Sequence, residues 1–127
     1  MLPASSGADV YRRLHIESRT PLELVVLLYD GALTRVAEAR TAIDHGDMPA
    51  FRGAISRVLG IVAELQNTLD MRGGGDIAKS LDSLYTFVTT ALMEASTRGS
   101  AHPLEGVQTV LSTLRDAWNE ISRGGTP

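Results

Sequence analysis

Apolar residues in this chain recur at intervals of three and four positions in four separate stretches. Side chains at this spacing lie on one face of an α-helix, so each stretch predicts an amphipathic helix with one buried stripe. No stretch alternates apolar and polar residues as a half-buried strand would. The pattern therefore predicts an all-α fold, an antiparallel up-down four-helix bundle. The stripes run over residues 22–43, 51–69, 77–95 and 107–121.

Helix-starting and helix-ending residues separate the stripes. Thr20-Pro21-Leu22-Glu23 combines a capping threonine, a proline at the first helical position and a glutamate that completes a capping box. Gly46, Gly73-Gly74-Gly75 and Arg98-Gly99-Ser100 mark the later breaks. The loops between the helices are short, so we expect consecutive helices to be antiparallel neighbours.

The length of 127 residues fits one domain. We expect a flexible N-terminal arm over residues 1–19, which carries a short apolar helical face, the four-helix bundle over 20–123, and a disordered tail over 124–127. The chain has no cysteine, which excludes disulfides and thiolate metal sites.

Several functional classes lack their signatures. The net charge of −3 argues against a nucleic-acid binder with a basic patch. The chain start has no signal-peptide pattern and no apolar run is long enough for a membrane span, so we expect a cytoplasmic protein without membrane insertion. The glycines of 73–75 precede Lys79-Ser80, as in a phosphate-binding loop, but they follow a predicted helix where that loop requires a strand.

The three histidines do not indicate a reactive centre. None lies in the Glu-x-x-His pattern of a di-iron bundle, and none has the exposed mid-helix position that histidine phosphotransfer needs. We therefore predict no catalytic residue, no metal and no cofactor. The histidines are His15, His45 and His102.

The first and third helices carry more apolar residues than a bundle core needs. On a helical wheel Leu24, Leu27 and Leu28 lie off the first stripe, and Tyr85 and Leu92 lie off the third. Apolar surface beyond the core commonly binds a partner, and a groove between helices suits an amphipathic helix. A wider core, on which the N-terminal arm docks permanently, fits the pattern equally well.

Short motifs occur in an order that resembles the flagellar secretion chaperone FliS family, which is specific for flagellin. The resemblance covers residues from about Tyr11 to Ile121. Its motifs are Thr20-Pro21 with Glu23-Leu24, Leu28-Tyr29-Asp30-Gly31-Ala32, Leu69-Asp70-Met71 with Gly73-Gly74 and Ile77-Ala78-Lys79, Leu84-Tyr85 with Leu92 and Glu94-Ala95, and Leu114-Arg115-Asp116 with Trp118.

This resemblance implies a four-helix bundle that binds the disordered C-terminal region of flagellin, blocks its premature polymerisation and delivers it to the flagellar type III export apparatus, without catalysis. It also implies that an N-terminal segment covers the binding surface when flagellin is absent. Export gate components and other flagellar regulators are further candidate partners. The residues expected to contact a partner or the arm are Tyr11, Leu14, Leu24, Leu27, Leu28, Met71, Tyr85 and Leu92.

Other motif residues are expected to be structural. Gly31 would permit a close approach of helices, and Asp30 would bond a neighbouring chain. Asp70, Met71, Gly73 and Gly74 would set the junction between the second and third helices, and Trp118 would lie in the core. A phosphotransfer bundle and a dimeric structural bundle remain the alternative classes.

Overall fold

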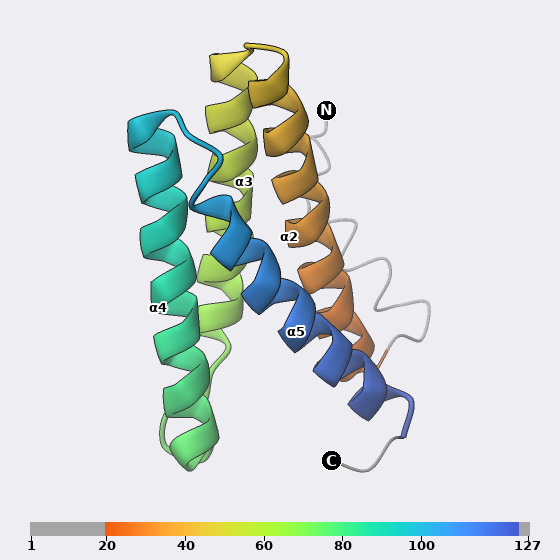
Figure 1. Ribbon diagram of the computed structural model, residues 1–127. Coiled ribbons are helices and arrows are strands. Elements are labelled where there is room, and N and C mark those ends of the chain that lie inside the picture. The colour runs from red at the N-terminus through yellow and green to blue at the C-terminus, as the bar shows by residue number, and fades with distance from the viewer. Residues whose placement is uncertain (1–19, 125–127) are drawn as a thin grey trace, which may run out of the picture.

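The computed structural model describes residues 20–124, which form four α-helices: α2 (Pro21–Asp44), α3 (Met48–Asn67), α4 (Gly75–Arg98) and α5 (Leu104–Ser122) (Figure 1). No strand occurs in this range. The expected all-α bundle is confirmed. The arm expected over residues 1–19, and all of the expected tail except Gly124, lie outside the described residues.

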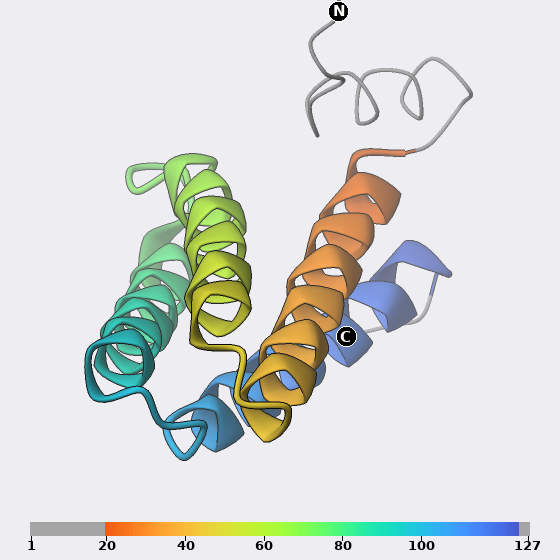
Figure 2. The same cartoon turned by 90° about the horizontal axis from the view of Figure 1, so that it is seen from above.

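The helices alternate in direction, and each packs against its neighbours in the chain. α5 returns to α2 and closes the ring. It begins beside α4 and then diverges from it, so that it ends next to the start of α2 (Figures 1 and 2). The bundle is therefore more open at the end where α2 and α4 begin and α3 and α5 finish.

Side-chain caps begin α2 and α3, and the first of them is the one that the sequence predicts. The Thr20 Oγ1 accepts a hydrogen bond from the Glu23 amide at 3.1 Å, and the Glu23 Oε1 accepts one from the Thr20 amide at 2.8 Å. This reciprocal pair is the expected capping box. At the start of α3, Asp47 Oδ1 accepts from the Ala50 amide at 3.1 Å.

The α3–α4 junction is built around Asp70. Its Oδ1 accepts from the amides of Arg72 and Gly73, at 3.1 and 2.9 Å, and its carbonyl accepts from the Gly74 amide at 2.8 Å. A Cβ on Gly74 would lie 2.6 Å from both the Asp70 carbonyl oxygen and the Ala78 Cβ. The expected role of Asp70, Gly73 and Gly74 in setting this junction is confirmed.

The core is apolar and draws on all four helices. Most residues of the four predicted stripes lie in this core. The exception is the third stripe, because the buried face of α4 is rotated about the helix axis from the predicted face. Ile77 was expected to be buried and is 72 % exposed, whereas Tyr85 and Leu92 were expected off the stripe and are 2 % and 0 % exposed. The large side chains at the centre of the core are Tyr29, Val36, Phe51, Ile55, Val58, Val62, Val88, Leu92, Leu104, Val107 and Leu111.

This difference arises because two registers on α4 satisfy the same three-four spacing. One contains Ile77 and Leu84, the other contains Tyr85 and Leu92, and both contain Val88. The packing of α4 between α3 and α5 selects the second register.

Gly31 does not bring two helices unusually close. A Cβ at this position would lie 3.7 Å from the Ile61 Cδ1, which is an ordinary van der Waals distance. Asp30 also differs from expectation, because its carboxylate pairs with Arg115 of the same chain, with 2.7 Å between Oδ1 and Nε. This ion pair joins α2 to α5.

Candidate functional site

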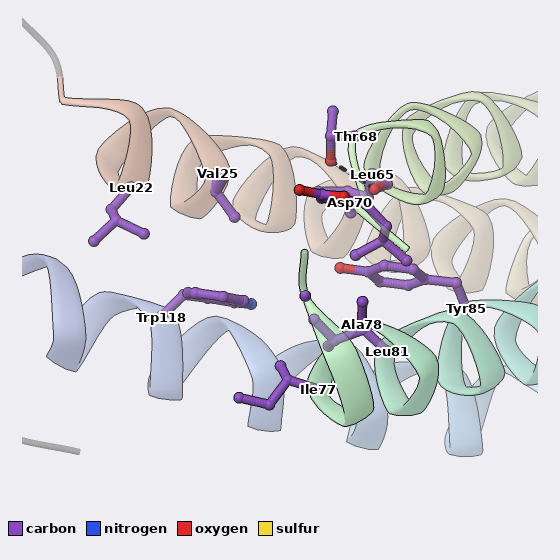
Figure 3. Close-up of a pocket in the computed structure, with 12 residues that line it drawn as sticks. Leu22, Val25, Leu65, Thr68, Asp70, Ile77, Ala78, Leu81, Tyr85 and Trp118 are labelled. Atoms are coloured by element: carbon purple, nitrogen blue, oxygen red, sulfur yellow. Dashed lines mark hydrogen bonds between the residues drawn. The ribbon is translucent and has the colours of Figure 1, made fainter. Parts of the chain in front are cut away.

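A pocket of about 240 Å³ lies at the open end of the bundle, and all four helices contribute to it (Figure 3). The lining comes from the start of α2, the first three turns of α4, the last turn of α3 with the loop that follows it, and the C-terminal part of α5. The lining residues are Leu22, Val25, Leu65, Thr68, Leu69, Asp70, Gly74, Ile77, Ala78, Leu81, Tyr85 and Trp118.

Apolar side chains around this pocket remain accessible to water. Ile77 is the most exposed of them, and Leu22, Val25, Leu81 and Trp118 are half-buried. Apolar area in contact with water costs roughly 25 cal/mol per Å², which is recovered when another apolar surface covers it. A concave, mainly apolar pocket with few polar groups has the character of a binding site.

Tyr85 supplies a phenolic hydroxyl to the pocket floor, and Tyr29 lies behind it without lining the pocket. The hydroxyl groups of Tyr29 and Tyr85 are hydrogen-bonded to each other, and both side chains are buried. Burial is the main influence and raises the pKa of both phenols. For Tyr29, the Tyr85 hydroxyl and the nearby Trp118 indole lower the pKa without cancelling the effect of burial. Both tyrosines are therefore neutral at physiological pH.

The structure separates the predicted contact residues. Tyr85 lines the pocket from its floor, but Leu92 lies in the core, so the expectation that both lie outside the core is wrong. Leu24 is buried, at 7 % exposure, but it does not belong to the core cluster that the four helices share.

Three further predicted contact residues, Leu27, Leu28 and Met71, lie apart from the pocket lining. Leu27 and Leu28 are half-buried, and Leu28 packs against the core. Met71 is 45 % exposed at the α3–α4 turn and does not line the pocket. Tyr11 and Leu14 lie outside the described residues.

Sequence reasoning assigned several pocket residues to the core. Leu22 and Val25 begin the first stripe, Ile77 and Leu81 begin the third, and Trp118 is near the end of the fourth. In an antiparallel bundle these stripe ends meet at one end of the molecule. The convergence of these stripe ends was the signal for a site that the sequence offered. The ends form a pocket only because α5 diverges from α4.

Two further searches of the described residues gave no site. Residues 20–124 contain no group of three or more histidine, aspartate or glutamate side chains arranged to hold a metal ion. None of the four helices has the length and hydropathy needed to cross a membrane.

Comparison with known proteins places this bundle among flagellar proteins. A family model described as "Flagellar protein FliS" matches residues 4–125. The "Flagellar secretion chaperone FliS" of Salmonella typhimurium is 33 % identical over 123 residues, covering 93 % of this chain and 91 % of the relative. The "Flagellar secretion chaperone FliSB" of Pseudomonas aeruginosa is 33 % identical over 123 residues, covering 94 % of this chain and 98 % of the relative.

A third relative, the "Flagellar secretion chaperone FliS" of Vibrio cholerae, is 29 % identical over 117 residues and covers 89 % of this chain and 86 % of its own length. The matches extend over nearly the whole chain and include every helix that lines the pocket. This chain belongs to the FliS family of flagellar secretion chaperones.

Proposed function

We propose that this protein is a cytoplasmic export chaperone that binds the disordered C-terminal region of flagellin, prevents its premature polymerisation and delivers it to the flagellar type III export apparatus. The observation that carries the proposal is the accessible apolar pocket at the open end of the bundle. The protein acts by binding and release, without a catalytic step. Export gate components and other flagellar regulators are further proposed partners.

The pocket suits an amphipathic helix formed by the client. The exposed Ile77 and the half-buried Leu22 and Trp118 offer apolar area on three different helices. A disordered client segment that becomes helical on this surface buries its own apolar face there. The cost of ordering the segment offsets part of the gain, which permits later release.

Residues 1–19 would cover this surface in the absence of the client, with Tyr11 and Leu14 as anchors. Such an arm competes with the client and lowers its apparent affinity. Leu27, Leu28 and Met71 would extend the contact beyond the pocket. Removal of residues 1–19 is expected to tighten or preserve binding if the arm is a competitor, and to weaken it if the arm is part of the site.

The test is calorimetric titration with a peptide from the C-terminal region of the flagellin encoded by the same genome. Saturable one-to-one binding with a strongly negative heat-capacity change is expected, because apolar area becomes buried. Ile77→Lys is expected to weaken binding about tenfold or more, since the lysine places a charge on the pocket rim.

Met93→Lys is the matched control. Met93 also lies on α4 and is 57 % exposed, but it does not line the pocket. This variant should bind as the wild-type protein does. No binding by the wild-type protein would refute the proposal. A concentration-dependent dimer that Ile77→Lys dissociates, measured by light scattering, would then assign the pocket to self-association.

A further inference from the structure

The lining of the pocket carries one phenolic hydroxyl, that of Tyr85, which points into the space between the helices (Figure 3). It is hydrogen-bonded to the hydroxyl of Tyr29. Tyr29 is 0 % exposed and does not line the pocket, whereas Tyr85 is 2 % exposed and does. The two hydroxyls therefore differ in their access to a bound ligand.

The two hydroxyl groups carry one more proton than the hydrogen bond between them requires. Each phenol has one proton to donate and can also accept a hydrogen bond. The bond between Tyr29 and Tyr85 uses one of the two protons. Among the residues that the structure describes, neither hydroxyl has a further acceptor. One proton of the pair is thus left without a protein acceptor.

The surroundings of the pair determine which proton this is. Tyr29 is fully enclosed and does not line the pocket, whereas Tyr85 does. A proton on the fully enclosed Tyr29 could reach no acceptor except Tyr85, and a buried donor without an acceptor is unfavourable. Tyr29 therefore donates to Tyr85, and the Tyr85 proton faces the pocket.

We infer that the Tyr85 hydroxyl is a specificity-determining donor that selects a client segment with a neutral carbonyl oxygen at the pocket floor. This inference rests on the proposed chaperone function. A client segment that covers the pocket with apolar atoms alone leaves the Tyr85 proton buried and unpaired, and so binds less tightly. An amide carbonyl at that position restores the hydrogen bond and fixes the register of the client helix.

The charge of the pocket favours a neutral acceptor over a carboxylate. Asp70 is the charged residue among the pocket lining, and it is acidic. A client carboxylate would meet this negative charge and would also lose its hydration among apolar side chains. The acceptor is therefore an amide carbonyl, either of an asparagine or glutamine side chain or of the main chain.

Two matched variants test the inference by calorimetric titration with the flagellin C-terminal peptide. Tyr85→Phe and Tyr29→Phe both abolish the hydrogen bond between the tyrosines, so both should lose stability, and Tyr85→Phe should lose more because it leaves the enclosed Tyr29 proton without an acceptor. Only Tyr85→Phe removes the donor that faces the pocket. It is expected to weaken peptide binding about tenfold, whereas Tyr29→Phe should change it by less than about twofold.

The other outcomes separate this inference from the proposed function. Equal effects of both variants on affinity, or no effect of Tyr85→Phe, would overturn the inference while the chaperone function stands. Absence of binding by the wild-type protein would overturn both.

A measurement on the wild-type protein covers the case in which Tyr85→Phe does not fold. With ring-labelled tyrosine, the ¹³Cζ resonance of Tyr85 is expected to move when the peptide saturates the protein, because its hydroxyl gains an acceptor. An unchanged resonance at saturation would overturn the inference. Replacing each asparagine and glutamine of the peptide by leucine, one at a time, identifies the source of the carbonyl. If one replacement lowers the affinity for the wild-type protein but not for Tyr85→Phe, the acceptor is that side-chain amide. If no replacement does so, the acceptor is a main-chain carbonyl.

Discussion

Single residues at the α3–α4 junction determine whether α4 can begin where it does. The Asp70 carboxylate organises the turn, and Gly74 fits beneath it because it has no Cβ. Since Gly74 also lines the pocket, the local packing of one glycine supports the geometry of the site.

Gly74→Ala is expected to destabilise the protein by about 1–3 kcal/mol, because the new methyl group would overlap the Asp70 carbonyl oxygen and the Ala78 Cβ. Urea unfolding followed by circular dichroism measures the loss. Gly60→Ala is the control, since Gly60 lies within α3 with nothing within 4 Å of a Cβ. It should gain about 0.5–1 kcal/mol from helix propensity. An equal gain in both variants would contradict the steric account.

At the scale of elements, the first turn of α2 has two roles. It carries the capping box of Thr20 and Glu23, and it presents Leu22 and Val25 to the pocket. The free amides of a helix start need acceptors, and the Thr20 side chain supplies one of them. The cap therefore holds in helical form the turn that supplies two of the pocket side chains.

Thr20→Ala is expected to lower the free energy of unfolding by about 1 kcal/mol, because one amide of the first turn loses its acceptor. Thr34→Ala is the control within α2, where the threonine hydroxyl bonds only to the Asp30 carbonyl of its own helix. That change should be neutral or stabilising, since alanine is the better helix former. Thermal unfolding of both variants measures these effects. An equal loss of stability in Thr20→Ala and Thr34→Ala would exclude a specific role of the cap.

At the scale of the whole molecule, the buried tyrosine pair couples global stability to alkaline pH. Burial raises the pKa of Tyr29 and Tyr85 above the ordinary value of 10.0. Below that value both states of the protein keep the phenol protons, so the pair adds no pH dependence. Above it the unfolded chain releases protons that the folded protein retains, and the free energy of unfolding falls as pH rises.

Stability measured by urea unfolding should be constant with respect to these groups up to about pH 9 and should decline above about pH 10. Tyr85→Phe should make the decline shallower, because the variant has one fewer phenol that titrates between the two states. A decline with the same slope in wild type and variant would show that Tyr85 is not protected from ionisation in the folded protein.

The sequence by itself determined the helices. The three-four spacing of apolar residues, the capping box at Thr20 and the glycines at 73–75 are local features, and local hydrogen bonding and sterics are sufficient to position helix ends. The order of short motifs likewise identified the family, since it needs no coordinates. The bundle followed because four amphipathic helices with short loops can bury their stripes only against one another.

Only the tertiary structure decided which apolar side chains remain accessible. Two registers on α4 have the same spacing, so the sequence could not choose between burying Ile77 and burying Tyr85. The pocket depends on the divergence of α5, which is set by how side chains from four helices pack together. Burial is a property of the assembled surface, and the chain pattern fixes only the face on which a residue lies.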